Sequence, residues 1–214
     1  MPGLGTDLYA DLYLPEEPAL PGRLLVYFAG ALSERRYEER RRTAPTIVAD
    51  EFAAAVGRGR GWGLLVVPPP PALVERGRAL QQRVAELVEA FVAALAAWKP
   101  STMAVVGMSY GAMLGCALTL EDSRCNRLAT LAGVGMADVV EAAPPDSVAG
   151  KAFRCFVNDD DPLSEQSHRF AALMANAGRP VEVISRKGEH SFADFVANGS
   201  AAEAFRFAVG LMRG

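Results

Sequence analysis

The sequence predicts an α/β fold with a mostly parallel central sheet and helices on both of its faces. Short apolar runs alternate along the chain with longer segments of helical periodicity. Several of these runs are almost continuously apolar, which is typical of strands buried on both sides. Because successive parallel strands are joined by crossovers, the intervening helices are expected to cover both faces of the sheet.

The strands are predicted from these apolar runs. Residues 8–15 alternate apolar and polar side chains and end in a proline, as an outer antiparallel strand does. The other runs are more continuously apolar and are expected inside the sheet. They span residues 23–30, 62–67, 103–106, 127–134, 152–157 and 181–185.

Helices are expected at residues 46–56, 72–98 and 164–177, with a final helical region that begins within residues 188–192. Residues 33–43 are the most charged segment of the chain, with arginines at both ends of the stretch 35–42. A solvated helix or loop with ion pairs is the simpler interpretation of this segment. An arginine patch that binds an anionic group on the substrate or its carrier is the alternative.

Length and composition limit the class of protein. The chain has 214 residues, of which 50% are hydrophobic and 22% are charged, so we expect a single domain spanning residues 1–214. A formal net charge of −3 gives no general attraction to nucleic acid or to anionic membranes, and neither is an expected partner. The sequence shows no signal peptide and no apolar run of about 18 residues, so a cytoplasmic location is expected.

Cysteine and histidine usage argues against disulfides and metals. Cys116, Cys125 and Cys155 form neither a C-x-x-C pair nor an even set, so reduced and mostly buried thiols are expected. With two histidines and no metal-ligand spacing, the sequence predicts no zinc site, and no cofactor is expected.

The central motif is a G-x-S-x-G around Ser109, which interrupts an apolar run and is followed by a helix of small residues. A strand, sharp turn and helix would hold the serine in a strained conformation, and side chains at Gly107 or Gly111 would collide with neighbouring elements. The helix N-terminus beneath the hydroxyl favours negative charge, as a tetrahedral oxyanion requires. Ser109 is therefore the predicted nucleophile for acyl transfer. An ordinary turn with a buried serine is the alternative.

A serine nucleophile needs a base within hydrogen-bond reach and an acid that orients the base. His190 follows the last expected strand in a G-x-H loop and is the predicted base. His168 lies inside the expected helix 164–177, where a solvated surface histidine is the simpler interpretation.

The predicted acid is one of three consecutive aspartates, Asp159, Asp160 and Asp161, which leave the strand before the histidine loop. Adjacent carboxylates repel one another, so one should point inward while the others face water. Asp161 is predicted because a proline follows it directly. Asp159, then Asp138 and then Asp194 are the alternatives, and the run could also simply cap the next helix.

The oxyanion hole is expected to use two backbone N–H groups, those of Tyr110 and Ala31. Ala31 follows the strand at residues 23–30, where Gly30 permits a close backbone approach. Gly30 directly precedes Ala31, and Met108 directly precedes Ser109. Both are expected to contact the substrate.

The order Ser109, Asp161, His190 on successive strand ends resembles the α/β-hydrolase superfamily over essentially the whole chain. The G-x-S-x-G looks like its nucleophile elbow, residues 157–163 are similar to its acid loop, and residues 188–192 are similar to its histidine loop. Together the three loops are specific for this fold, and none of them identifies a subfamily.

Two features of the chain depart from many members. Ala29 and Gly30 stand where the family often has His-Gly, so a supporting contact of the oxyanion hole is missing. Too few residues separate the strands at 127–134 and 152–157 for the lid helices that many members insert, so the resemblance implies an open site without a large lid.

The resemblance implies a compact serine esterase or thioesterase. It would cleave a carboxylic ester or thioester through an acyl-enzyme, and the open site would admit a small-molecule substrate or an acyl group tethered to a carrier. A non-catalytic binding protein with this fold and an acyltransferase that uses the same triad are the alternatives. The substrate's chain length and the oligomeric state are not predicted by the sequence.

Overall fold

A computed structural model gives the structure of the chain. It describes residues 10–15, 21–30, 34–57, 61–67, 82, 84–86, 89–90, 93 and 99–211, and for residues 34–44 it describes the backbone only. The helix expected at residues 72–98 lies largely outside the described residues.

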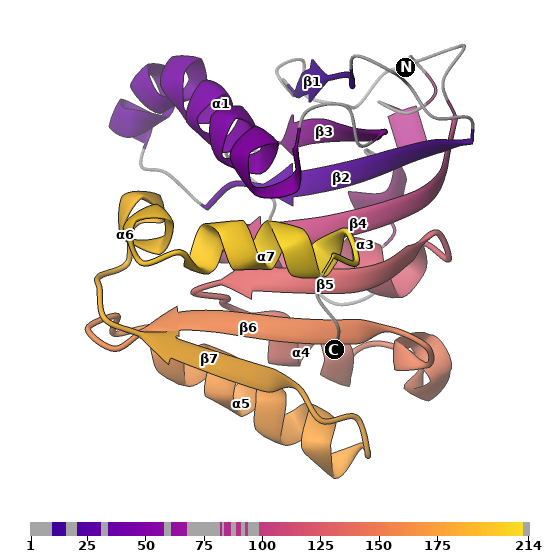
Figure 1. Cartoon of the computed structure of the whole chain (residues 1–214). Coiled ribbons are helices and arrows are strands. Elements are labelled where there is room, and N and C mark those ends of the chain that lie inside the picture. Colours follow the sequence, from indigo (N-terminus) through magenta and orange to yellow (C-terminus); the bar gives the residue numbers. More distant parts are fainter. Residues whose placement is uncertain are drawn as a thin grey trace.

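The described residues form a seven-stranded sheet in the order β1-β3-β2-β4-β5-β6-β7 (Figure 1). The outer strand β1 pairs antiparallel with β3, and the other pairs are parallel. This confirms the mostly parallel sheet and the antiparallel outer strand expected from the sequence. The strands are β1 Asp11–Tyr13, β2 Gly22–Phe28, β3 Trp62–Val67, β4 Pro100–Met108, β5 Cys125–Leu131, β6 Ala152–Asn158 and β7 Glu182–Arg186.

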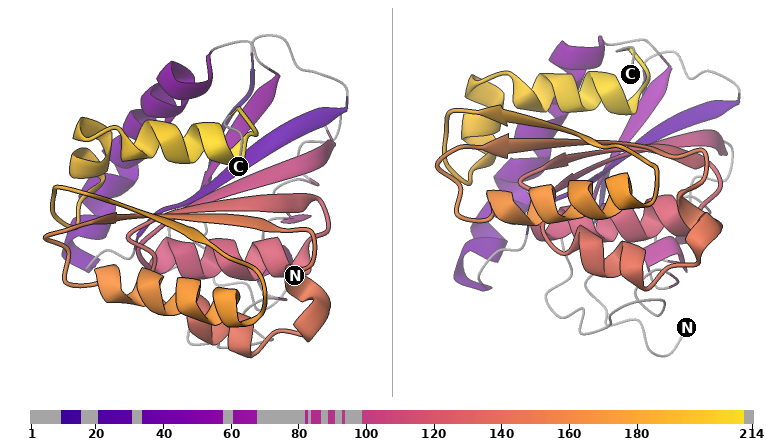
Figure 2. Two further views of the ribbon diagram at one scale, coloured as in Figure 1. Left: turned by 60° about the horizontal axis from the view of Figure 1, so that its bottom comes forward. Right: turned by 90° about the horizontal axis from the view of Figure 1, so that it is seen from below.

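Helices cover both faces of this sheet, as expected. One layer contains α1 (Glu34–Val56), α6 (Phe192–Ala197) and α7 (Ser200–Ala208). The opposite layer contains α3 (Tyr110–Glu121), α4 (Met136–Glu141), the 3-10 helix η1 (Pro145–Val148) and α5 (Ser164–Asn176). Figure 2 shows the sheet between the two layers. None of the helices in the described part of the chain is long and apolar enough to cross a membrane.

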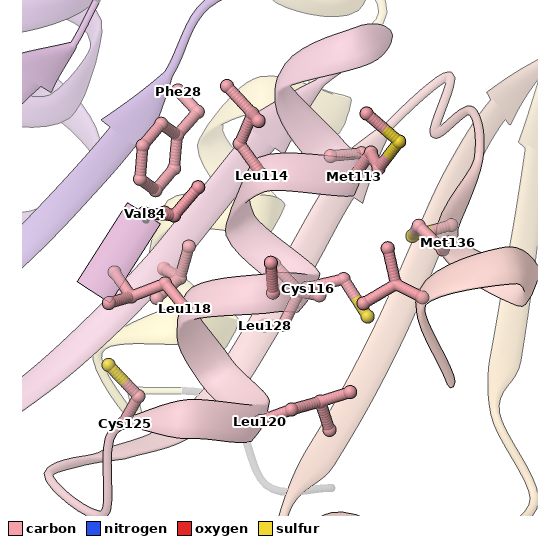
Figure 3. Close-up of a cluster of buried hydrophobic side chains, with 14 of the residues drawn as sticks. Phe28, Val84, Met113, Leu114, Cys116, Leu118, Leu120, Cys125, Leu128 and Met136 are labelled. Atoms are coloured by element: carbon pink, nitrogen blue, oxygen red, sulfur yellow. The ribbon is translucent and has the colours of Figure 1, made fainter. Parts of the chain in front are cut away.

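The continuous apolar strands build a core on each side of the sheet. In β2, Phe28 is buried against α3, whereas the neighbouring Tyr27 is buried on the opposite face. There its ring packs edge-on against Phe192 of α6, with 5.8 Å between ring centroids. Figure 3 shows the α3 side, where Phe28 and Val84 meet the helix residues Leu114 and Leu118. Alternate side chains of one strand thus supply both cores.

Helix α1 is longer than the sequence indicated. The helix expected at residues 46–56 is confirmed, but its start was wrong, because the helix begins at Glu34 and runs through Pro45. An interior proline removes one backbone hydrogen bond and costs about 3 kcal/mol. Val48, Phe52 and Val56 offset that cost by packing into the core one helical turn apart. The charged segment is therefore helical from Glu34 onward, and the alternative interpretation as an arginine patch stays untested.

The first testable prediction concerns the contact between β2 and the first turn of α3. A Cβ on Gly111 would overlap the Phe28 carbonyl oxygen and lie 2.6 Å from its carbonyl carbon. Alanine is normally preferred to glycine in helices by about 1 kcal/mol, yet Gly111→Ala should lower the free energy of unfolding by roughly 3 kcal/mol. Urea titration measures this change.

Gly150→Ala is the control for this experiment. Gly150 has φ +71° and no atom within 4 Å of an added Cβ, so the variant carries backbone strain alone, about 1 kcal/mol. A smaller loss for Gly111→Ala than for Gly150→Ala would contradict the close packing of β2 on α3.

Candidate active site

Ser109 stands at the turn between β4 and α3 in a strained backbone conformation, with φ 51° and ψ −123°. Its N–H donates to the Leu131 carbonyl oxygen at 2.9 Å. Its own carbonyl oxygen accepts from the N–H groups of Ala112 at 3.0 Å and Val134 at 3.2 Å. A sparsely populated conformation of this kind costs about 1–3 kcal/mol and persists only where its surroundings impose it. Hydrogen bonds from three segments do so here.

Glycines let the backbone close around this turn. A Cβ on Gly107 would lie 2.6 Å from the Ala112 Cα, and the overlap at Gly111 was described above. Both collisions agree with the sequence prediction. A Cβ on Gly30 would lie 3.1 Å from Ser109 Cβ and 3.8 Å from its Oγ, so the chain following β2 passes directly beside the serine.

Of the other expected oxyanion and substrate residues, the structure describes two. Tyr110 begins α3, so its N–H belongs to the first turn of that helix. Met108 ends β4, and its Sδ accepts a weak hydrogen bond from the buried Tyr27 hydroxyl at 3.8 Å. Ala31, the expected second oxyanion donor, lies outside the described residues. The roles given to these residues stay predictions.

Asp161 and His190 come together at the carboxyl end of the sheet. The Asp161 Oδ2 lies 2.7 Å from His190 Nδ1. Asp161 is 2% exposed, and its other carboxylate oxygen accepts from the Leu163 N–H at 2.8 Å. The imidazole is 28% exposed, so one edge of it remains accessible from solvent. A buried carboxylate bound to Nδ1 selects the tautomer whose Nε2 is free to accept a proton.

The alternative aspartates have other partners. Asp159 and Asp160 are exposed, and the Asp159 carboxylate accepts from the Ser185 hydroxyl. Asp138 forms an exposed ion pair with Arg169, with 3.1 Å between oxygen and nitrogen. These carboxylates face solvent, as expected for two members of the aspartate run.

The remaining candidates, Asp194 and His168, also lie outside the pair formed by Asp161 and His190. Asp194 accepts from the Glu189 N–H at 2.9 Å and thus contacts the histidine loop through its backbone. His168 is exposed on α5, which agrees with its interpretation as a surface histidine.

The site also uses residues that the sequence did not single out. Strand β5 ends at Leu131, earlier than the expected residue 134, because Ala132 adopts a positive φ of 49°. The chain then turns so that the Val134 N–H reaches the Ser109 carbonyl. No residue type marks this turn, since alanine rarely adopts such a φ. Asn158, at the end of β6, is fully buried between the acid and histidine loops.

The segment after β5 forms no large lid. The helices α4 and η1 both pack on α3, and α4 also packs on α5, so they belong to the helix layer (Figure 2). Within the described residues, no group of three or more His, Cys, Asp or Glu side chains could hold a metal ion.

No protein-family model and no curated protein matches the chain. Solved structures do. The fluorophosphonate-binding serine hydrolase FphF of Staphylococcus aureus is similar with a TM-score of 0.67 and 13% identity, over 98% of this chain and 95% of that one. A hyperthermophilic esterase from the archaeon Pyrobaculum calidifontis is similar with a TM-score of 0.65 and 15% identity, over 98% of this chain and 80% of that one. The chain has the α/β-hydrolase fold. A ferulic acid esterase shares the α/β-hydrolase fold with a TM-score of 0.64 and 13% identity, over 96% of this chain and 99% of that one.

The three cysteines lie in the core and not in the site. Cys116, Cys125 and Cys155 are free and buried, as expected from the sequence. Burial raises the pKa of all three thiols, that of Cys155 to about 12. Because the thiolate is the reactive form, these thiols are inert in the folded protein.

The second prediction follows from this burial. The native wild type should show no rapid reaction with a thiol reagent such as dithiobis(nitrobenzoate) at pH 8, and the unfolded chain should show 3 equivalents. Ser109→Cys should add one fast-reacting thiol in the native protein, since the turn is only half-buried. A fast native thiol in the wild type, or none in Ser109→Cys, would contradict the placement of these residues.

Proposed function

We propose that this protein is a serine hydrolase that cleaves a carboxylic ester or thioester through an acyl-enzyme. The observation that carries the proposal is the buried Asp161 carboxylate 2.7 Å from His190 Nδ1, in a sheet whose strand β4 leads into the strained Ser109. Serine at such an elbow, with a carboxylate-oriented histidine after the last strand, is the arrangement that nucleophilic acyl transfer requires.

In the proposed mechanism, Ser109 Oγ attacks the substrate carbonyl carbon while His190 Nε2 takes the hydroxyl proton. Asp161 holds the imidazole and stabilises the imidazolium. The carbonyl oxygen becomes an oxyanion held by the N–H groups of Tyr110 and Ala31. His190 then returns the proton to the leaving alcohol or thiol, and the acyl-enzyme forms. Water, deprotonated by the same imidazole, releases the acid and restores the serine.

The substrate is proposed to be a small-molecule ester or an acyl group tethered to a carrier. The absence of a large insertion after β5 supports this, because an uncovered site does not select by enclosure. The similar solved structures described as esterases and as a serine hydrolase support hydrolysis of an ester. No resident cofactor is required by the proposed steps.

The third prediction tests the nucleophile. Ser109→Ala should lower kcat for hydrolysis of a p-nitrophenyl ester by roughly three orders of magnitude or more, because the attacking oxygen is gone. The wild type should form a single fluorophosphonate adduct, detected by intact mass, and Ser109→Ala should form none. Ser101→Ala, at the exposed opposite end of β4, is the control and should keep both. Full retention of hydrolysis by Ser109→Ala would refute the proposal.

The fourth prediction tests the acid. Asp161→Asn should lower kcat about 10⁴-fold, because the amide no longer stabilises the imidazolium and permits the wrong tautomer. Asp160→Asn makes the same chemical change at an exposed neighbour and should leave kcat within about twofold. If Asp159→Asn were the damaging change instead, the acid would be misassigned.

A non-catalytic binding protein is the second candidate, favoured by Ala29 at the position where the resembled family often has histidine. It predicts ligand binding without acylation, so a stoichiometric adduct on Ser109 would exclude it. An acyltransferase with the same residues is distinguished by adding an alcohol or amine, which would then intercept the acyl-enzyme faster than water does.

A further inference from the structure

Two asparagine side chains join the loops around His190. Asn158 is the last residue of β6 and is 0% exposed. Its Oδ1 accepts from the Nδ2 of Asn198, which lies between α6 and α7, at 2.8 Å. A buried amide is costly unless its donors and acceptors are satisfied, so this contact restricts how the two segments can meet.

Asn158 contacts both loops of the proposed acid–base pair. Its side-chain Nδ2 donates to the carbonyl oxygen of Glu189, the residue before His190, at 2.7 Å. Its backbone carbonyl accepts from the Asp161 N–H at 3.1 Å. One buried residue therefore fixes the start of the acid turn and the chain leading into the imidazole.

Glu189 is held on both sides of its backbone. Besides the bond from Asn158 to its carbonyl, its N–H donates to Asp194 Oδ2 at 2.9 Å. Gly188, with φ +146°, lets the chain pass close to this point, because a Cβ there would lie 3.0 Å from Asn158 Nδ2. We call Asn158, Asp194 and Asn198 the Glu189 clamp, since the first two bind Glu189 and the third orients Asn158.

The hydrogen-bond partners of Asn198 determine which way its amide faces. Its Oδ1 accepts from the Ser200 N–H at 3.0 Å, so its Nδ2 must point the other way. That nitrogen donates to the Lys187 carbonyl at 3.1 Å as well as to Asn158. The acceptor side of Asn158 is thereby occupied, and its Nδ2 is left facing Glu189. The donors and acceptors alternate consistently through the network.

We propose that the Glu189 clamp positions His190 for catalysis. The inference rests on the proposed hydrolase function, in which the imidazole must reach both Asp161 and the serine hydroxyl. The contacts of the clamp residues with the histidine loop reach backbone atoms of Glu189 and Lys187, so they act through the backbone that carries the histidine. A misplacement of about 1 Å in a catalytic group can cost about 100-fold in rate, which is the size of effect a loosened loop would have.

The fifth prediction uses Asn198→Asp. The variant keeps an oxygen to accept from the Ser200 N–H and nearly the same volume, but it replaces both donated bonds with oxygen–oxygen contacts and adds a negative charge. We expect kcat for a p-nitrophenyl ester to fall about 10- to 100-fold, with KM within about twofold. Asn126→Asp makes the same change at an exposed position at the start of β5 and should leave both constants unchanged.

A second readout does not depend on hydrolysis. The His190 Nδ1 proton shared with Asp161 should give a strongly downfield proton NMR signal, identified by its loss in His190→Gln. Asn198→Asp should shift or broaden this signal, and Asn126→Asp should not. If the wild type gives the signal but no hydrolysis and no fluorophosphonate adduct, the proposed function fails while the positioning of the imidazole is still tested.

Two results would overturn the clamp. The first is an Asn198→Asp protein with wild-type kcat and NMR signal, including one whose only change is a lower melting temperature. The second result comes from two variants of Asp194, which provide the test if Asn198→Asp does not fold. Asp194→Ala removes the acceptor of the Glu189 N–H and should lower kcat, whereas Asp194→Asn retains an oxygen there and should restore most of it. Equal kcat for both Asp194 variants would contradict the proposal.

Discussion

The candidate site depends on the strained turn at Ser109, which must be held from several directions. Ser109 has a backbone conformation that the chain would leave if its neighbours allowed it. Its peptide groups are bound by the end of β5, by the first turn of α3 and by the turn that contains Val134. The parallel sheet supplies the first of these partners, because β5 ends beside β4 at the same edge.

This constraint also explains the composition of α3. The helix starts directly at the strained serine and runs under the sheet, with every residue from Gly111 to Leu120 buried. A helix enclosed on all sides cannot carry a polar face, and its small residues let β2 and β4 approach. Figure 3 shows its side chains packed among those of the neighbouring elements. The burial that places the serine also makes Cys116 unreactive, because the same apolar surroundings raise its pKa.

The sequence predicted the parts of the molecule that depend on local pattern. Continuous apolar runs indicated the parallel strands, and the proline after Asp161 indicated which of three aspartates turns inward. The start of α1 was missed, because an interior Pro45 is tolerated only through packing with distant elements. Asn198 was missed for a related reason. Its contact with Asn158 joins residues 40 apart, and a single asparagine in a loop has no distinguishing pattern.

The serine and the imidazole are held by different physical means, and this affects which mutations each can tolerate. Backbone hydrogen bonds and glycines fix Ser109, so substitutions of Gly107 or Gly111 act by steric overlap and affect folding and reactivity together. Two side-chain amides and a carboxylate fix the loop before His190, and two of these three residues, Asp194 and Asn198, are half-buried. Exchanging Asn198 for aspartate keeps the side-chain volume, removes two donated hydrogen bonds and adds a negative charge beside the loop. The loop before His190 is therefore the part of the site whose hydrogen bonds can be exchanged without the steric overlap that substitutions at the serine turn cause.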